Sequence, residues 1–374
     1  MVIQRIHPLS QPDALLLQSE ANFVLTLPPA ANQSSVFVHF SKPLAPLRPV
    51  ALSPSGKRLL LRADTDQGSW LALLEPGGRP VELVRLNPWL RNIQPGQLQS
   101  LAYQNAAGKK LTARVLLPPN HAPGKRWPAL VIHGVGFPGS LGVPSFLHPH
   151  LLAARGFVVL DPQAQGGHYA ADNENPFQPL WHNLKPAIDA LVSQGVVDPE
   201  RIVALGHSFG GFLFAHLISI THRFSAAILI APAEANLASA YGHLTDVTRG
   251  NGYLHPLLFL KAGFAMFETD GGSFRFLKPP PWRHPKEFAR FSPLTYVDRV
   301  ETPVLLIQGD ADARIDMTET EQYFAALYRQ GKRARLVRYA GEHHWIEGRK
   351  NLTHLYTQID EWTKEGSPGS SRAK

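Results

Sequence analysis

The chain has 374 residues, of which 44% are hydrophobic and 18% are charged, a composition typical of a globular protein with a sizeable core. It has no cysteine, which excludes disulfides, thiolate metal sites and a cysteine nucleophile. The formal charge is +8, but the 37 lysines and arginines are scattered and do not alternate with aromatic residues. We therefore expect no nucleic-acid partner.

Membrane and export signals are missing from the sequence as written. No apolar stretch approaches the roughly 20 residues that a membrane helix needs, and the first 20 residues lack the apolar segment of a signal peptide. We expect a soluble, cytoplasmic protein with no membrane partner.

Short runs of strand-forming residues occupy the first part of the chain, over 35–40, 57–62, 69–74 and 81–86. Turn residues separate them, as in Ser53-Pro-Ser-Gly56 and Glu75-Pro-Gly-Gly78. This pattern predicts antiparallel sheet in an all-β segment over residues 1–95.

The pattern changes after residue 95, where apolar strands alternate with helical stretches. Residues 98–118 predict a hairpin that turns at 105–108. Further strands are predicted at 129–133, 157–160, 202–205, 226–230, 304–307 and 334–339. Helices are predicted at 151–155, 181–194, 209–219, 319–330 and 352–364. The alternation indicates a mostly parallel sheet with helices on both faces, here over 96–365, followed by a flexible tail at 366–374.

The sequence Gly206-His-Ser-Phe-Gly210 lies between an apolar strand and an apolar helix. This pattern predicts the nucleophile elbow of the α/β-hydrolase fold, in which a tight strand-to-helix turn would expose the Ser208 hydroxyl above the sheet. Serine is a poor nucleophile at neutral pH, so it needs a basic histidine that is oriented by an acid.

Acid and base candidates follow in the chain order that this fold uses, each in a loop after a later strand. The loop after 304–307 carries Asp310, Asp312 and Asp316, and the loop after 334–339 carries His343 and His344. The residues alone leave both choices open.

A tetrahedral intermediate also needs two preorganised N–H donors for its oxyanion. We expect one from the backbone of Phe209, at the start of the helix after the nucleophile. The second is expected from Val135, in the glycine-rich His133-Gly-Val-Gly136 loop.

These motifs together resemble the prolyl oligopeptidase family of serine peptidases, with its dipeptidyl-peptidase and acylaminoacyl-peptidase relatives. Val197-Asp-Pro-Glu-Arg-Ile202 before GHSFGG is similar to the family's nucleophile region. The family's acid pattern, Gly-x-x-Asp-x-x-Val/Ile, falls on Gly309, Asp312 and Ile315, and its Tyr-x-x-Glu-x-His pattern ends on His344. The resemblance therefore implies a triad of Ser208, His344 and Asp312.

Family members carry an N-terminal β-propeller, and about 95 residues leave room for about two blades of roughly 40–50 residues. We expect a partial propeller, either in a fragment of a longer protein or in a reduced form. Its exposed β edge would offer a surface for forming a homo-oligomer. The apolar stretch 253–267 is interpreted as a lid, a core helix or a dimer contact.

The leading hypothesis is a serine peptidase that cleaves amide bonds in small peptides or acyl-amino acids, with no cofactor and no metal. A carboxylesterase for small esters is the first alternative, because the same triad serves both chemistries. A non-catalytic binding or assembly module is the second.

Overall fold

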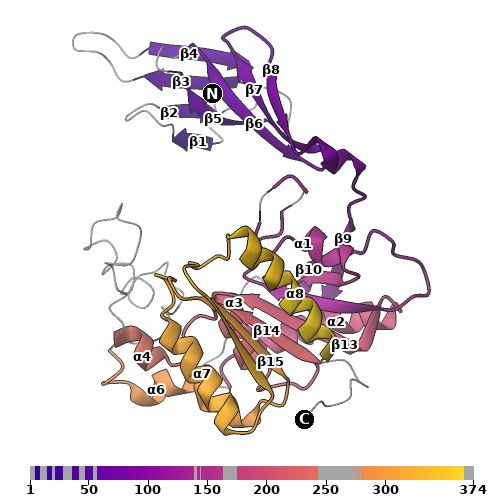
Figure 1. Cartoon of the computed structure of the whole chain (residues 1–374), viewed down its shortest axis with the longest axis vertical. Helices are drawn as coiled ribbons and strands as arrows, with labels where there is room; N and C mark the ends of the chain where they lie inside the picture. The colour runs from indigo at the N-terminus through magenta and orange to yellow at the C-terminus, as the bar shows by residue number, and fades with distance from the viewer. Residues whose placement is uncertain are drawn as a thin grey trace. The chain divides into compact units, whose positions relative to one another are not determined.

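The structure is a computed structural model (Figure 1) that describes the backbone of the first four strands and then 47–53, 57–138, 141–143, 145–162, 175–242, Phe274, Leu277 and 280–365. The stretch 253–267 and the tail 366–374 lie outside the described residues. Contacts within the chain define two units: Met1–Pro95 with Pro138–Ser145, and Gly96–Phe137 with Phe146–Lys374.

The first unit contains two four-stranded antiparallel sheets, each with its strands in chain order. The first sheet consists of β1 (Arg5–Pro8), β2 (Leu15–Gln18), β3 (Asn22–Leu27) and β4 (Val36–Ser41). The second consists of β5 (Arg48–Leu52), β6 (Leu59–Thr65), β7 (Gly68–Leu74) and β8 (Val81–Leu86), and the short 3₁₀ helix Pro88–Asn92 follows it. The predicted all-β segment is confirmed, and each sheet has the four antiparallel strands of a propeller blade.

Strand β8 forms one edge of the second sheet, and all six of its residues are exposed. Val81, Leu83, Val84 and Leu86 are its apolar members. Self-association through this edge stays a prediction.

The segment Pro138–Ser145 belongs to the first unit although it is inserted in the sequence of the second. The N–H of Leu141 donates to the Asp66 carboxylate at 2.8 Å. The Ser69 hydroxyl donates to the carbonyl of Gly142 at 3.1 Å. These two bonds attach the segment to the loop between β6 and β7 and to β7 itself.

The second unit is built on an eight-stranded sheet in the order β9-β10-β12-β11-β13-β14-β15-β16. Its strands are β9 (Gln97–Gln104), β10 (Lys110–Leu117), β11 (Trp127–His133), β12 (Val158–Asp161), β13 (Val197–His207), β14 (Ala226–Ile230), β15 (Val304–Gly309) and β16 (Ala334–Tyr339). β9, β10 and β12 pair antiparallel, and all other neighbours are parallel. The predicted mostly parallel sheet is confirmed, as is the β9–β10 hairpin at its edge.

Helices cover both faces of this sheet. They are α1 (Pro149–Ala154), α2 (Gln178–Ser193), α3 (Phe209–Leu217), α4 (Leu237–Gly242), α6 (Pro285–Arg290), the 3₁₀ helix Pro293–Arg299, α7 (Met317–Arg329) and α8 (Arg349–Glu365). One apolar core joins α2, α3 and α7 to one face, and a second joins α1 and α8 to the other. Strand β13 serves both, because Ala204 enters the first core while Val203 and Leu205 enter the second.

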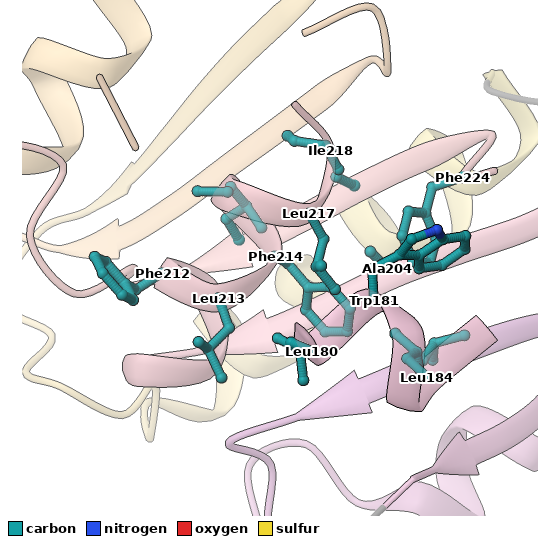
Figure 2. Close-up of a cluster of buried hydrophobic side chains, with 14 of the residues drawn as sticks. Leu180, Trp181, Leu184, Ala204, Phe212, Leu213, Phe214, Leu217, Ile218 and Phe224 are labelled. Atoms are coloured by element: carbon teal, nitrogen blue, oxygen red, sulfur yellow. The ribbon is translucent and has the colours of Figure 1, made fainter. Parts of the chain in front are cut away.

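The first core is dense in aromatic rings around α3 (Figure 2). Phe212 is fully buried and packs edge-on against Phe177 and Phe274, each with a centroid distance of 5.2 Å. Helix α3 follows the nucleophile turn directly, so this packing also fixes the start of the helix.

No helix in the described part of the chain combines the length and the apolar character that crossing a membrane requires.

Replacing Phe212 with alanine removes a fully buried ring and leaves a cavity. We expect Phe212→Ala to lower the unfolding free energy by about 3–5 kcal/mol in urea titrations followed by fluorescence. Leu151→Ala in α1, where the side chain is 44% exposed, should change it by only about 0.5 kcal/mol. Equal effects of the two substitutions would contradict the core described above.

His216 lies inside the first core, where burial lowers its pKa from 6.5 to about 3. Between pH 6.5 and 3 the unfolded chain therefore binds a proton at His216, whereas the folded chain keeps this ring neutral. The neutral His216 thus stabilises the fold fully above pH 6.5, and this contribution is lost as the pH falls toward 3. We expect His216→Gln, which keeps a donor for the Phe291 carbonyl, to flatten the acid limb of the stability curve by up to about 1.4 kcal/mol per pH unit. Parallel curves for the two proteins would contradict this.

Candidate active site

Ser208 occupies the tight turn between β13 and α3, with φ 57° and ψ −125°. A positive φ is strained for a residue with a side chain, so the surroundings must hold it. The Ser208 N–H donates to the Ile230 carbonyl at 2.9 Å, and the Ser208 carbonyl accepts from Phe212 at 3.1 Å and Ala233 at 3.0 Å. The turn is thus bonded to both its own helix and the end of β14.

Glycines make this turn possible by letting backbones approach closely. A Cβ on Gly206 would lie 2.5 Å from the Gly210 carbonyl oxygen. A Cβ on Gly210 would lie 2.1 Å from the His133 carbonyl oxygen, at the end of β11. Neither site accepts a side chain without a backbone shift, which gives the physical reason for the glycines on either side of Ser208.

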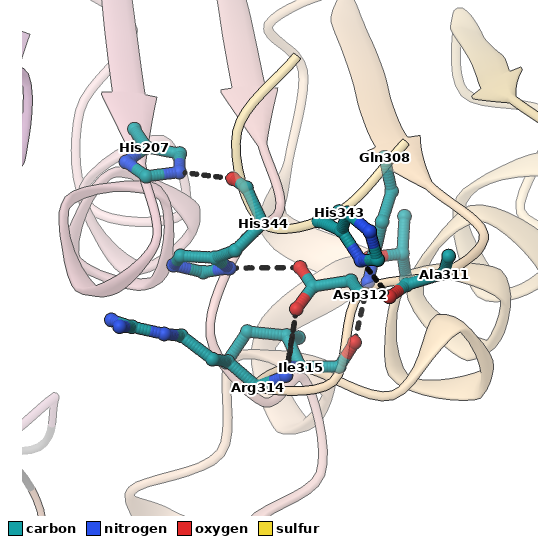
Figure 3. A network of polar contacts seen from close by, with 9 residues as sticks. His207, Gln308, Ala311, Asp312, Arg314, Ile315, His343 and His344 are labelled. Atoms are coloured by element: carbon teal, nitrogen blue, oxygen red, sulfur yellow. Dashed lines mark hydrogen bonds and ion pairs between the residues drawn. The ribbon is translucent and has the colours of Figure 1, made fainter. Parts of the chain in front are cut away.

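Asp312 lies after β15, where its carboxylate accepts three hydrogen bonds. Its Oδ1 accepts from the N–H groups of Arg314 at 2.8 Å and Ile315 at 3.0 Å. Its Oδ2 accepts from Nδ1 of His344 at 2.8 Å (Figure 3). The two side chains of this pair are only 1% and 5% exposed, so their attraction is little weakened by water.

The neighbouring aspartates have other roles in the loops. Asp310 accepts from the Gly341 N–H at 2.7 Å and from Arg338 Nε at 3.2 Å, and the bond from Gly341 is the main cause that lowers its pKa. Asp316 caps α7 by accepting from the Thr318 N–H at 2.8 Å. Asp312 is therefore the aspartate of this loop that bonds to His344, the base that the family resemblance selected.

His344 follows β16 and presents its Nδ1 to Asp312. An ionised carboxylate only accepts, so Nδ1 carries the proton and Nε2 of the neutral ring keeps its lone pair. A histidine in this state can act as a general base through Nε2. The adjacent His343 donates from Nδ1 to the Ala311 carbonyl at 2.8 Å and so braces the acid loop.

Glu342 holds the base loop and was not singled out by sequence reasoning, although it lies within the Tyr-x-x-Glu-x-His pattern. Its carboxylate accepts from the N–H groups of Glu347 at 2.7 Å and Gly348 at 3.0 Å and from Asn351 at 2.6 Å. Burial alone would raise the pKa of Glu342, but these bonds outweigh it and lower the pKa. Its backbone carbonyl accepts from Ala311 at 2.9 Å, which ties the acid and base loops together.

A second acid near the pair, Glu234, also escaped the sequence analysis. It follows β14 with φ 21°, and its side chain is buried. Its Oε2 has no hydrogen-bond partner among the described residues. Burial raises its pKa well above the usual 4.5, and the nearby carboxylates of Glu319 and Asp312 raise it further. A protonated Glu234 adds no second negative charge beside Asp312.

The two expected oxyanion donors lie at the carboxyl ends of adjacent strands. Phe209 is the first residue of α3, whose N–H groups at this end point out of the helix. Val135 follows β11, and its buried side chain packs in the second core. Between β11 and Val135, Gly134 has φ 70° and approaches the His207 carbonyl so closely that a Cβ would lie 2.2 Å from it. The loop is thus held close to the nucleophile turn.

Comparison with known proteins gives concordant results. The chain is 26% identical over 328 residues to the acylamino-acid-releasing enzyme of Rattus norvegicus. The aligned region covers 84% of this chain and 40% of that enzyme. It is 24% identical over 330 residues to dipeptidyl-peptidase 5 of Porphyromonas gingivalis, with 76% of this chain and 43% of that protein covered. The chain spans less than half the length of these curated relatives.

Solved structures share the fold. The acylaminoacyl peptidase of Pyrococcus horikoshii superposes with a TM-score of 0.67 at 16% identity, over 100% of this chain and 57% of that one. The model of the prolyl oligopeptidase family matches residues 145–252 and 266–368, which is more than half of the sequence. By this match, the chain belongs to the prolyl oligopeptidase family.

Proposed function

We propose that this chain is a serine peptidase that cleaves amide bonds in small peptides or acylated amino acids, with Ser208 as nucleophile, His344 as general base and Asp312 as its orienting acid. The observation that carries the proposal is the buried 2.8 Å bond between His344 Nδ1 and Asp312 Oδ2. This bond leaves Nε2 of His344 as the free basic nitrogen. The His344 ring lies next to the ring of His207, the residue that precedes Ser208.

The mechanism follows from these positions. His344 Nε2 takes the proton of the Ser208 hydroxyl as the oxygen attacks the substrate carbonyl, and Asp312 stabilises the resulting imidazolium. The N–H groups of Phe209 and Val135 receive the negative oxygen of the tetrahedral intermediate. His344 then gives the proton to the leaving amine, and an ester to Ser208 remains. Water, activated by the same histidine, hydrolyses this acyl-enzyme.

The substrate class rests on the family and on the names of the relatives. Acylamino-acid-releasing enzymes and a dipeptidyl-peptidase are among the relatives, and all of these names denote action near a peptide terminus. We propose acylated amino acids before dipeptides, because the acylamino-acid-releasing enzyme of Rattus norvegicus matches 84% of this chain and dipeptidyl-peptidase 5 matches 76%.

The first test uses a matched pair of substrates, an acyl-alanine nitrophenyl ester and the corresponding nitroanilide. We expect the chain to cleave both, and Ser208→Ala to lower kcat by about 10⁴- to 10⁶-fold because the nucleophile is gone. Cleavage of the ester alone would identify a carboxylesterase. Equal rates for wild type and Ser208→Ala would contradict the proposal and favour a binding module.

The second test separates the aspartates of the acid loop. Asp312→Asn keeps the size of the side chain, but its amide no longer stabilises the imidazolium, so we expect kcat to fall by roughly 10⁴-fold. Asp316→Asn is the matched control, because asparagine caps a helix as well as aspartate and kcat should stay near wild type. A greater loss in Asp316→Asn than in Asp312→Asn would exclude Asp312 as the acid.

A further inference from the structure

His207, the residue before Ser208, is a buried histidine that the proposed mechanism does not use. It ends β13 with 4% of its surface exposed. Burial, and next the neighbouring His344 ring, lower its pKa from 6.5 to about 4, so the ring is neutral at physiological pH. A neutral ring beside the base leaves no second positive charge to oppose the imidazolium that forms on His344 during catalysis.

The His207 ring bonds to the backbone of the base. Its Nε2 donates to the His344 carbonyl at 2.8 Å, and the two ring centroids are 4.7 Å apart (Figure 3). Phe146 packs edge-on against the His207 ring with a centroid distance of 4.9 Å, and the Trp345 ring centroid lies at 6.4 Å. The orientation of the ring is thus fixed by neighbours from two segments of the chain, Phe146 and His344–Trp345.

A neutral imidazole carries one N–H, and in His207 the His344 carbonyl accepts it from Nε2. The ring therefore makes its one donated bond to the backbone of the residue that supplies the proposed base. Because His207 directly precedes Ser208, this bond ties the backbone of the base to the residue next to the proposed nucleophile.

We propose that His207 is a positioning residue for the reaction: its imidazole N–H holds the backbone of His344, and with it the basic ring, next to the end of the strand that leads into Ser208. This inference rests on the proposed function, since the position of His344 matters only if it acts on Ser208. In the proposed mechanism the His207 ring neither contacts the substrate nor transfers a proton. We therefore expect its removal to change kcat, through the position of His344.

The test compares two substitutions of His207 with a matched control. His207→Phe keeps an aromatic ring and loses the hydrogen bond to the His344 carbonyl, whereas His207→Gln keeps a side-chain N–H. His216→Phe is the control, because His216 is equally buried and its Nε2 also donates to a backbone carbonyl, that of Phe291 at 3.0 Å, outside the site. Circular dichroism and thermal unfolding verify that each variant folds.

We expect His207→Phe to lower kcat for the nitrophenyl ester by about 10- to 100-fold with KM changed by less than about 3-fold, because a displaced base weakens proton transfer in the transition state and not substrate binding. His207→Gln should recover part of the loss, and His216→Phe should keep the wild-type kcat. Unchanged kcat in His207→Phe, or an equal loss in all three variants, would overturn the proposal.

A second measurement does not depend on turnover. The proton shared by His344 Nδ1 and Asp312 gives a low-field signal in the proton NMR spectrum, and we expect it to shift or broaden in His207→Phe and to return in His207→Gln. If wild type and Ser208→Ala have equal activity, the proposed function fails, and this signal alone decides on His207. A signal that is identical in wild type and His207→Phe would then overturn the inference.

Discussion

The candidate site depends on a backbone-to-backbone approach between the start of α3 and the end of β11. A Cβ placed on Gly210 would lie 2.1 Å from the carbonyl oxygen of His133. A Cβ placed on Gly134 would lie 2.2 Å from the carbonyl oxygen of His207. Gly134 after β11 thus leaves room for the His207 carbonyl, and Gly210 in α3 leaves room for the His133 carbonyl. This close approach holds the loop that carries Val135 near the strained Ser208 turn. A side chain at either glycine would need a backbone shift, and we expect such a shift to disturb the two expected oxyanion donors, Phe209 and Val135.

The acid and base loops form a second rigid element, because several bonds join them besides the bond between the two functional side chains. Gly341 donates to Asp310, Ala311 donates to the Glu342 carbonyl, and His343 donates to the Ala311 carbonyl. Such a network keeps the Asp312–His344 geometry in place before substrate arrives, and preorganisation of this kind is what lowers an activation barrier. Without such a network, the desolvation penalty of a buried ion pair would exceed the attraction between its charges.

Much of this architecture could be predicted from the sequence, because it depends on local patterns. The apolar strands of the parallel sheet and the Gly206-x-Ser208-x-Gly210 turn are continuous in the chain. Strands β1 to β3 and β5 were not predicted: β1 and β2 have four residues each, too few to show an alternation of apolar and polar residues. Helices α4 and α6 have six residues each and escaped for the same reason.

The supporting residues of the site were beyond such reasoning, because their roles depend on contacts between distant segments. Asp310, Asp312 and Asp316 are alike in sequence and differ only in what the fold places next to them. His207 and Glu234 carry no local signal either. The bond from His207 spans 137 positions to His344, and the neighbours that raise the pKa of Glu234 come from α7 and the acid loop.

The inserted segment Pro138–Ser145 has a consequence for the way this chain is divided in the laboratory or in evolution. Because the segment belongs to the first unit, the chain passes between the units at residue 95, again at 137 and once more at 145. A cut at residue 95 would leave Leu141 and Gly142 without Asp66 and Ser69, their hydrogen-bond partners. That loop begins three residues after Val135. The β-rich unit is therefore not a detachable module, and an excised hydrolase unit would need its 138–145 loop redesigned.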